Sequence, residues 1–261
     1  MNGVKVEDIS SDIRAAALDY VSPNGPRRVV RRPKTEVAAE QFSVPYKRGT
    51  LSIRSWGDGA PVLLIHGWAA NQTDMFSYVP PLIGGGFKAI AMDLPAHGES
   101  SGEYAGLEHL ADGILAASAH VGPLAGVIAH SAGCAATQLA IAAEMVVEKA
   151  VMLASPINYE INAYRHAKRL GYDADQTAQF IQALSDLDVR VAIKSVDFVP
   201  AFKTPALIIH SEDDAVIPVS MVEDLSGFWN GSQFLKVNGL NHRGVLKDES
   251  VISTAIKFLV E

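Results

Sequence analysis

The stretch that most constrains the fold of this chain is residues 126–136 (GVIAHSAGCAA), which has Ser131 at its centre. Its first four residues form an apolar run typical of a strand that is buried on both faces. From Ala132 to Met145 the chain is rich in small and helix-forming residues and contains no proline. We therefore expect a strand that passes directly into a helix at Ser131.

A serine at such a strand-to-helix turn is typical of a nucleophile elbow, in which a strained backbone lifts the hydroxyl above the edge of the sheet. The strand and the helix cross closely there, so the flanking residues must be small. Ala129 and Gly133 meet this requirement, with alanine in place of the first glycine of the usual Gly-x-Ser-x-Gly pattern. The alternative is that Ser131 only caps a helix, and this pentapeptide is too short to decide between the two.

The fold class follows from apolar runs that recur along the chain with helix-forming segments between most of them. Strands are expected at residues 61–65, 88–92, 126–129, 149–154, 205–209 and 234–237, after a hairpin formed by residues 41–46 and 51–56. Strands that alternate with helices form right-handed crossover units. The sequence therefore predicts an α/β protein with a mostly parallel, eight-stranded sheet and helices on both faces.

The alternation of strands and helices is interrupted between residues 155 and 203. Helix-like segments occur there at 159–170, 175–186 and 189–194, and the segment is longer than an ordinary connection. We interpret residues 155–203 as a helical cap inserted into an α/β core made of residues 39–154 and 204–261.

Two further helix predictions concern the N-terminal part of the chain. Residues 1–38 are predicted to hold an amphipathic helix at 7–20, followed by a basic, proline-bounded connector at 23–34, which we expect to be solvated. A helix that starts near residues 71–74 is expected to kink or end at the proline pair of residues 80–81.

The composition narrows the class of protein. The chain has 261 residues, of which 48% are hydrophobic and 20% charged, as expected for a globular enzyme-sized domain. The net charge of -7 argues against a general nucleic-acid binder. Cys134 is the single cysteine, so no intramolecular disulfide can form. Neither a signal peptide nor an apolar run of about 18 residues is present, so we expect a cytoplasmic monomer or homodimer with no membrane partner.

A serine hydroxyl needs a base within hydrogen-bond reach, and the base needs a third group that orients it. Residues 210–218 (HSEDDAVIP) follow one predicted strand and offer Glu212, Asp213 and Asp214 as acids. His242 follows the last predicted strand. Ligands bind outside the carboxyl ends of strands in such sheets, so these residues are expected to meet at Ser131. The backbone amides of Trp68 and Ala132 are candidates for stabilising an oxyanion.

Four motifs in this order carry a resemblance to a known family. They are residues 66–68 (HGW), 93–100 (DLPAHGES), 129–133 (AHSAG), and 210–218 followed by His242. Over residues 40–261 the chain resembles the α/β-hydrolase superfamily. The resemblance implies a serine hydrolase of the esterase type, which needs neither a metal nor an organic cofactor.

The resemblance also assigns roles to residues of this chain. It implies that Ser131 is the nucleophile, His242 the base, and Asp214 the acid, since in similar sequences the acid shortly precedes a Val/Ile-Pro pair. Asn241 stands before His242 where the family usually has glycine. We expect a small-molecule ester or thioester substrate, with small or medium uncharged acyl groups.

Other residues are candidates for a substrate pocket. Met75, Tyr159, Tyr164 and Phe180 could line it or only pack the cap, and His130 lies beside the nucleophile, where a scaffold role is the alternative. Hydrolysis of a thioester or a carbon–carbon bond on the same three catalytic residues remains open. A protein that binds a ligand in this pocket without turnover is a further alternative.

Overall fold

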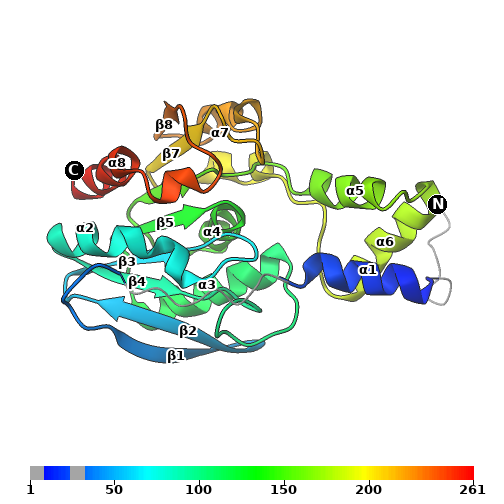
Figure 1. The fold of residues 1–261 in the computed structure, drawn as a ribbon, viewed down its shortest axis with the longest axis horizontal. Helices are drawn as coiled ribbons and strands as arrows, with labels where there is room; N and C mark the ends of the chain where they lie inside the picture. Colours follow the sequence, from blue (N-terminus) through cyan, green and yellow to red (C-terminus); the bar gives the residue numbers. More distant parts are fainter. Residues whose placement is uncertain (1–8, 24–32) are drawn as a thin grey trace.

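The computed structural model describes residues 9–23 and 33–261. Eight strands form one sheet in the order β1-β2-β4-β3-β5-β6-β7-β8 (Figure 1). The strands are β1 (Glu40–Tyr46), β2 (Gly49–Trp56), β3 (Ala60–Ile65), β4 (Phe87–Met92), β5 (Gly126–His130), β6 (Ala150–Leu153), β7 (Ala206–Ser211) and β8 (Ser232–Val237). The pairs β1–β2 and β2–β4 are antiparallel and all the others are parallel. The predicted eight-stranded, mostly parallel sheet is confirmed.

Helices cover both faces of the sheet. One face packs against α3 (Leu107–Val121), α4 (Ala132–Ala142) and α7 (Glu223–Phe228), and the other against α2 (Val79–Gly84) and α8 (Glu249–Val260). Short 3-10 turns η5 (Val219–Met221) and η6 (Gly244–Leu246) precede α7 and α8. A central strand is therefore buried on both sides, which explains why its sequence is continuously apolar rather than alternating.

The helix expected to start near residues 71–74 and to kink or end at Pro80 and Pro81 is a 3-10 helix that ends just before these prolines. This helix, η2 (Gln72–Tyr78), comes first, and α2 then begins at Val79 with both prolines in its first turn. The amides of a first helical turn have no partner within the helix, so proline costs nothing there and its fixed φ favours the helix. The prolines therefore lie where one helix ends and the next begins, and the sequence analysis did not foresee the second helix.

The segment between β6 and β7 holds α5 (Glu160–Arg169), α6 (Ala174–Asp186), and the short turns η3 (Ser195–Asp197) and η4 (Val199–Ala201). The helix-like piece expected at 189–194 does not form, because Lys194 instead makes an antiparallel bridge with Asn158. The two ends of the segment therefore run side by side.

A buried glutamine fixes both ends of this segment to the core. Gln138 of α4 donates from Nε2 to Ser155 Oγ (3.0 Å) and accepts from Ser195 Oγ (2.6 Å). All three side chains are buried. Since Ser155 follows β6 and Ser195 precedes β7, the hydrogen bonds hold the base of the segment against the helix that follows Ser131.

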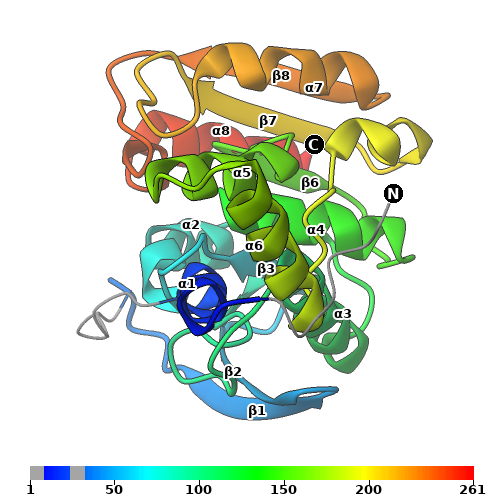
Figure 2. The same ribbon diagram turned by 90° about the vertical axis from the view of Figure 1, so that its right-hand side faces the viewer.

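The N-terminal helix α1 (Ser11–Val21) packs against α6, far along the chain. Its buried face, with Ala17 and Val21, joins Ala167 and Phe180 in a hydrophobic cluster separate from the two sheet cores. We call α1, α5 and α6 the cap layer, which lies in front of the sheet in Figure 2 and to its right in Figure 1.

Two further expectations, on the basic connector and on the division of the chain, are not tested by the structure. Most of the basic connector predicted at 23–34 lies outside the described residues, and the division of the chain at residues 38, 154 and 203 stays a prediction. Within residues 9–23 and 33–261, no helix combines the length and apolar character that crossing a membrane requires.

Candidate active site

Ser131 connects β5 to α4 with a strained backbone, at φ 52 and ψ -124. A non-glycine residue in this region costs roughly 1–3 kcal/mol. Two hydrogen bonds hold it: the Ser131 amide donates to Leu153 O (2.9 Å), and its carbonyl accepts from the Cys134 amide (2.8 Å). The turn has the geometry predicted from the sequence.

The small residues around Ser131 differ in how strictly they are needed. A Cβ on Gly133 would lie 2.3 Å from the backbone oxygen of His66, so only glycine fits without moving the backbone. Ala129 is fully buried, and its methyl group belongs to the sheet core. The missing first glycine of the pattern is thus accommodated.

Cys134 lies behind the elbow. It is fully buried, and its thiol donates to the carbonyl of Ala129 (3.1 Å). Burial raises the pKa of this thiol to about 12, so it stays protonated. The side chain acts as a small apolar group at the junction of strand and helix.

The three predicted catalytic side chains form one continuous hydrogen-bonded chain. His242 Nε2 lies 3.0 Å from Ser131 Oγ, and His242 Nδ1 lies 2.7 Å from Asp214 Oδ2. An ionised carboxylate can only accept, so Nδ1 carries the proton. The neutral ring then presents the Nε2 lone pair to the serine hydroxyl, as a general base must.

The hydrogen bonds of Asp214 distinguish it from the neighbouring acids Glu212 and Asp213. Its Oδ1 accepts from the amides of Val216 (2.8 Å) and Ile217 (2.9 Å). Burial alone would raise the pKa of Asp214, but the hydrogen bonds from His242 and these amides prevail and lower it. The carboxylate is therefore ionised and fixed in orientation.

The two competing acids have other partners. Asp213 Oδ2 accepts from the Gly239 amide at 2.6 Å and so ties this loop to the one that leads to His242. Glu212 pairs with Lys236 on the adjacent strand (2.9 Å). Asn241, which stands where glycine was expected, accepts from the amide of Arg243 through its side chain (3.1 Å). This turn presents His242 without a glycine.

The amides of Trp68 and Ala132 both border the cavity at Ser131. Within the part of the chain that the structure describes, neither amide donates to a protein acceptor. Ala132 is also the first residue of α4, where the helix dipole favours negative charge. The two amides therefore remain the candidates for stabilising an oxyanion.

Two buried histidines hold the Trp68 loop. His66 accepts from the Leu94 amide (3.0 Å) and donates to the Gly67 carbonyl (2.7 Å). His97 accepts from the Ala69 amide (3.2 Å). Burial lowers the pKa of His66 to about 4 and that of His97 to about 3, so both rings are neutral and can accept.

Asp93, at the start of the 93–100 motif, is a structural residue whose role sequence reasoning did not assign. Its carboxylate accepts from the amides of Gln72 (2.7 Å) and Glu99 (3.0 Å), so it joins η2 to the loop after β4. A Cβ on Gly98 would lie 2.3 Å from the Asp93 carboxyl carbon. Asp93 and Gly98 therefore pack directly against each other. Their joint presence in the 93–100 motif is the sequence feature from which this structural role could have been predicted.

His130 precedes the nucleophile and contacts the base loop. Its Nε2 donates to the backbone oxygen of His242 (2.9 Å), and the two ring centroids are 4.9 Å apart. Burial lowers the pKa of His130 to about 3, so the ring is neutral. This hydrogen bond helps to hold the backbone of His242 in place, and His130 does not border the cavity.

A cavity of about 420 Å³ opens over Ser131, between the strand ends and the cap layer. Of the pocket candidates, Tyr159 borders it, whereas the other four do not. Met75 is fully buried in the sheet core, and Phe180 in the cluster of the cap layer. Tyr164 is 46% exposed. Large apolar side chains are suited to both cores and pockets, so the sequence could not distinguish the two. In the structure, Met75 and Phe180 belong to hydrophobic cores.

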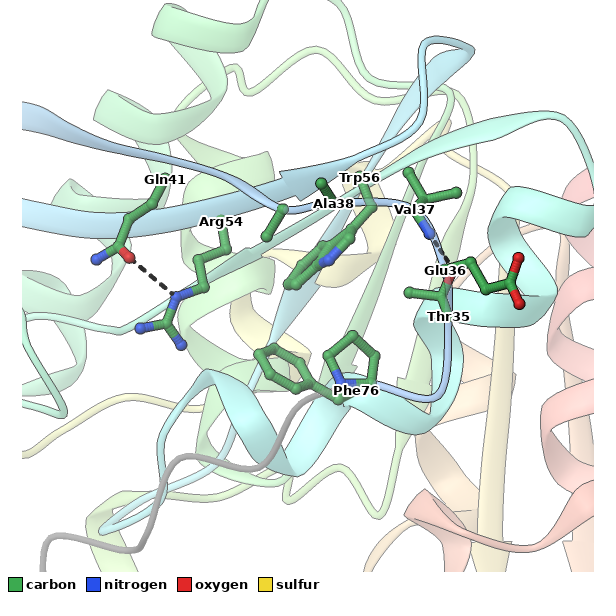
Figure 3. Close-up of a pocket in the computed structure, with 10 residues that line it drawn as sticks. Thr35, Glu36, Val37, Ala38, Gln41, Arg54, Trp56 and Phe76 are labelled. Atoms are coloured by element: carbon green, nitrogen blue, oxygen red, sulfur yellow. Dashed lines mark hydrogen bonds between the residues drawn. The ribbon is translucent and has the colours of Figure 1, made fainter.

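A second cavity, of about 630 Å³, lies under residues 33–39, beside Trp56 and Phe76 (Figure 3). Arg54, one of its two charged lining residues, is hydrogen-bonded to Gln41 (3.4 Å) and to Glu99 (3.1 Å). Among the described residues, no serine, cysteine or histidine borders this space. No group of three or more His, Cys, Asp or Glu side chains among the described residues could hold a metal ion.

Comparison with known proteins agrees with this fold. Residues 62–249 match the alpha/beta hydrolase family. Since the match covers most of the sequence, the chain belongs to this family.

Similar proteins match over shorter stretches. A serine hydrolase-like protein of Danio rerio is 41% identical over 66 residues, which are 24% of this chain and 20% of that protein. A non-heme haloperoxidase of Rhodococcus erythropolis is 34% identical over 71 residues, 26% of each chain. The alignments span about a quarter or less of these relatives.

Solved structures match over the whole fold. An esterase of Pyrococcus furiosus superposes with a TM-score of 0.72 at 18% identity, covering 91% of this chain and 97% of that one. A thermophilic esterase of Thermogutta terrifontis gives a TM-score of 0.67 at 19% identity, covering 84% of this chain and 97% of that one. At these identities the likeness establishes the fold.

Proposed function

We propose that this protein is a serine hydrolase that cleaves carboxylic esters through an acyl-enzyme. The observation that carries the proposal is the hydrogen-bonded chain from Ser131 through His242 to Asp214. Trp68 and Ala132 border the same cavity, and their amides have no acceptor among the described residues. The names of the matched relatives and the membership of the alpha/beta hydrolase family support it further.

In the acylation step, Ser131 Oγ attacks the ester carbonyl carbon while its proton passes to His242 Nε2. Asp214 stabilises the imidazolium that forms, and the amides of Trp68 and Ala132 donate to the oxyanion. The oxyanion then collapses, the bond to the alcohol oxygen breaks, and the alcohol leaves with the proton from His242. The product is an ester of Ser131.

In the deacylation step, a water molecule takes the place of the alcohol. His242 removes a proton from the water as its oxygen attacks the acyl carbon, and the same two amides stabilise the second oxyanion. Collapse breaks the bond to Ser131 Oγ, which recovers the proton from His242. The carboxylic acid leaves, and the enzyme returns to its starting state.

Labelling with a fluorophosphonate tests the proposal directly. The reagent should modify Ser131 and abolish hydrolysis of 4-nitrophenyl acetate, and peptide mass spectrometry should locate the adduct. The Ser131→Ala variant is the matched control and should take up no label while it keeps its fold. Labelling at another serine, or turnover that survives in Ser131→Ala, would exclude this assignment.

A further inference from the structure

The cavity over Ser131 has two walls of different chemistry. The floor holds Ser131 and the candidate oxyanion donors, whereas another part of the lining includes Tyr20 and Arg169 of the cap layer and Arg190 of the loop after α6. Among residues 9–23 and 33–261, neither an aspartate nor a glutamate borders the cavity. The described part of its lining therefore combines two guanidinium groups with no acid.

Arg190 is already neutralised by a neighbour. Its Nε lies 2.9 Å from Glu108 Oε1, and its backbone amide donates to Glu108 Oε2 (3.3 Å). This pair ties the loop after α6 to the first turn of α3. Arg190 thus has a structural role that accounts for its charge.

Arg169 has no such partner. Its Nη2 donates to His166 Nδ1 (3.1 Å), so that nitrogen is unprotonated. Burial first, and the Arg169 charge second, lower the pKa of His166, which keeps the ring neutral. None of the ion pairs formed by the described residues involves Arg169. Its positive charge is therefore not balanced by a carboxylate.

The other groups around Arg169 do not supply an anion to the cavity. Burial raises the pKa of Tyr20 to about 12 against the opposing charge of Arg169, so the phenol is neutral. Asp19 raises the pKa of His166 but does not border the cavity. Within the described residues no carboxylate pairs with Arg169 on the cavity side, so a carboxylate of a bound molecule could take that place.

The rest of the lining is mostly apolar and includes Val21, Leu107, Val189 and Ile217. A hydrogen bond between two charged groups is stronger than one between neutral groups. Guanidinium is also the side chain best suited to bind a carboxylate through two parallel bonds. The net charge of -7 disfavours anions in general, so a preference for them must be local.

We propose that the substrate is an ester that bears a free carboxylate away from the scissile bond, and that Arg169 binds this carboxylate. The inference rests on the proposed function, because Ser131 defines which end of the cavity holds the ester. The carboxylate can belong to the acyl group, in place of the uncharged acyl group expected from the sequence, or to the alcohol.

Matched ester pairs test the proposal. In one pair, 4-nitrophenyl hydrogen adipate is compared with 4-nitrophenyl methyl adipate, which places the charge in the acyl group. In the other, 6-acetoxyhexanoate is compared with its methyl ester, which places it in the alcohol. We expect a higher kcat/KM for the charged member of at least one pair. No preference in either pair would overturn the proposal.

Arginine variants assign the preference. Arg169→Gln should lower the ratio of charged to neutral kcat/KM by about 10- to 100-fold, the range typical of a lost charged hydrogen bond. Arg165→Gln, on the same helix but away from the cavity, is the matched control and should keep the ratio. Arg190→Gln should change the ratio less than Arg169→Gln. An unchanged ratio in Arg169→Gln contradicts the proposal.

A binding measurement separates this inference from the proposed function. Isothermal titration calorimetry of adipate against Ser131→Ala, with and without Arg169→Gln, needs no turnover. Adipate binding that depends on Arg169 supports the carboxylate site even if no ester is cleaved. Cleavage of neutral esters together with Arg169-independent binding leaves the hydrolase proposal intact and excludes the carboxylate site.

Discussion

The floor and the cap-layer wall of the same cavity are built in opposite ways. In the floor, the polar side chains of His66, His97 and Asp93 accept hydrogen bonds from backbone amides. All three lie in loops and are nevertheless almost fully buried from solvent. The cap-layer wall instead carries exposed arginines on a small cluster of its own. The floor is suited to fixing a reaction geometry to within a fraction of an ångström, and the wall to selecting the molecule.

The largest effect should come from the acid in the floor. Asp214→Asn leaves the geometry but no longer holds His242 with its proton on Nδ1, so kcat should fall by about 10⁴-fold. Asp213→Asn is the matched control: it removes a charge one residue away, and its side-chain oxygen can still accept from Gly239. Its kcat should change by less than about tenfold. Steady-state kinetics on a neutral ester decide, and equal losses in both variants would contradict the assignment.

The next effect concerns the cluster of the cap layer. Phe180 is fully buried among Tyr20, His166 and Tyr172, so Phe180→Ala should destabilise this layer by about 3–5 kcal/mol. Tyr164→Ala, on a neighbouring helix but 46% exposed, should have little effect. Hydrogen exchange of α1 and α6 measures the loss. Exchange that rises equally in β5 would mean that the layer has no stability of its own.

A pair of glycine variants compares the packing of the two regions. Gly133→Ala places a methyl group against the backbone of His66 and should cost about 1–3 kcal/mol or more. Gly171→Ala, between the cap helices, meets open space and only the strain of φ +76, which costs about 1 kcal/mol. Urea unfolding midpoints measure both. A Gly133→Ala variant as stable as Gly171→Ala would contradict the close crossing at the elbow.

The smallest change expected from a single substitution is in the slope of stability with pH. The folded pKa values of His66, His97 and His130 are about 4, 3 and 3, against an ordinary value of 6.5. Below pH 6.5 the unfolded chain therefore binds protons that the folded chain refuses, and stability is lost as the pH falls towards 4. Each histidine contributes up to about 1.4 kcal/mol per pH unit.

Urea midpoints measured from pH 7 to pH 4 give this slope. His97→Asn removes one titrating group from the floor and should make the slope shallower by close to one proton. The half-exposed His166 of the cap layer is the control, and His166→Asn should change the slope less. A slope that is the same in all three proteins would place the acid sensitivity elsewhere.

The floor could be predicted from sequence because its signals are local. Apolar runs identify the strands, and functional side chains follow them directly, so Ser131 and His242 could be placed at one edge of the sheet. Gly133 could also be interpreted from sequence, because a strand and a helix that cross closely leave no room for a side chain there. What spacing could not separate was Asp213 from Asp214, because the choice depends on which carboxylate meets the imidazole and which meets the Gly239 amide.

The cap layer could not be predicted because its contacts join distant parts of the chain. Nothing in the pattern of α1 says that it packs on α6, since Ala17 is suited to any close helix contact. Arg169 lies in the last turn of α5, where a cation is favourable for the helix dipole whether or not a ligand exists. The proposed binding of a carboxylate by Arg169 depends on the cavity that α1 and α5 help to line, which the sequence does not reveal.

The buried thiol at the elbow has a practical consequence. Cys134 is the single cysteine, it is fully buried, and its pKa keeps it protonated, so the folded protein offers no reactive thiol. A thiol reagent can reach it only when α4 separates from β5. The rate of its modification therefore measures how often the support of Ser131 comes apart, from within three residues of the nucleophile and without any introduced probe.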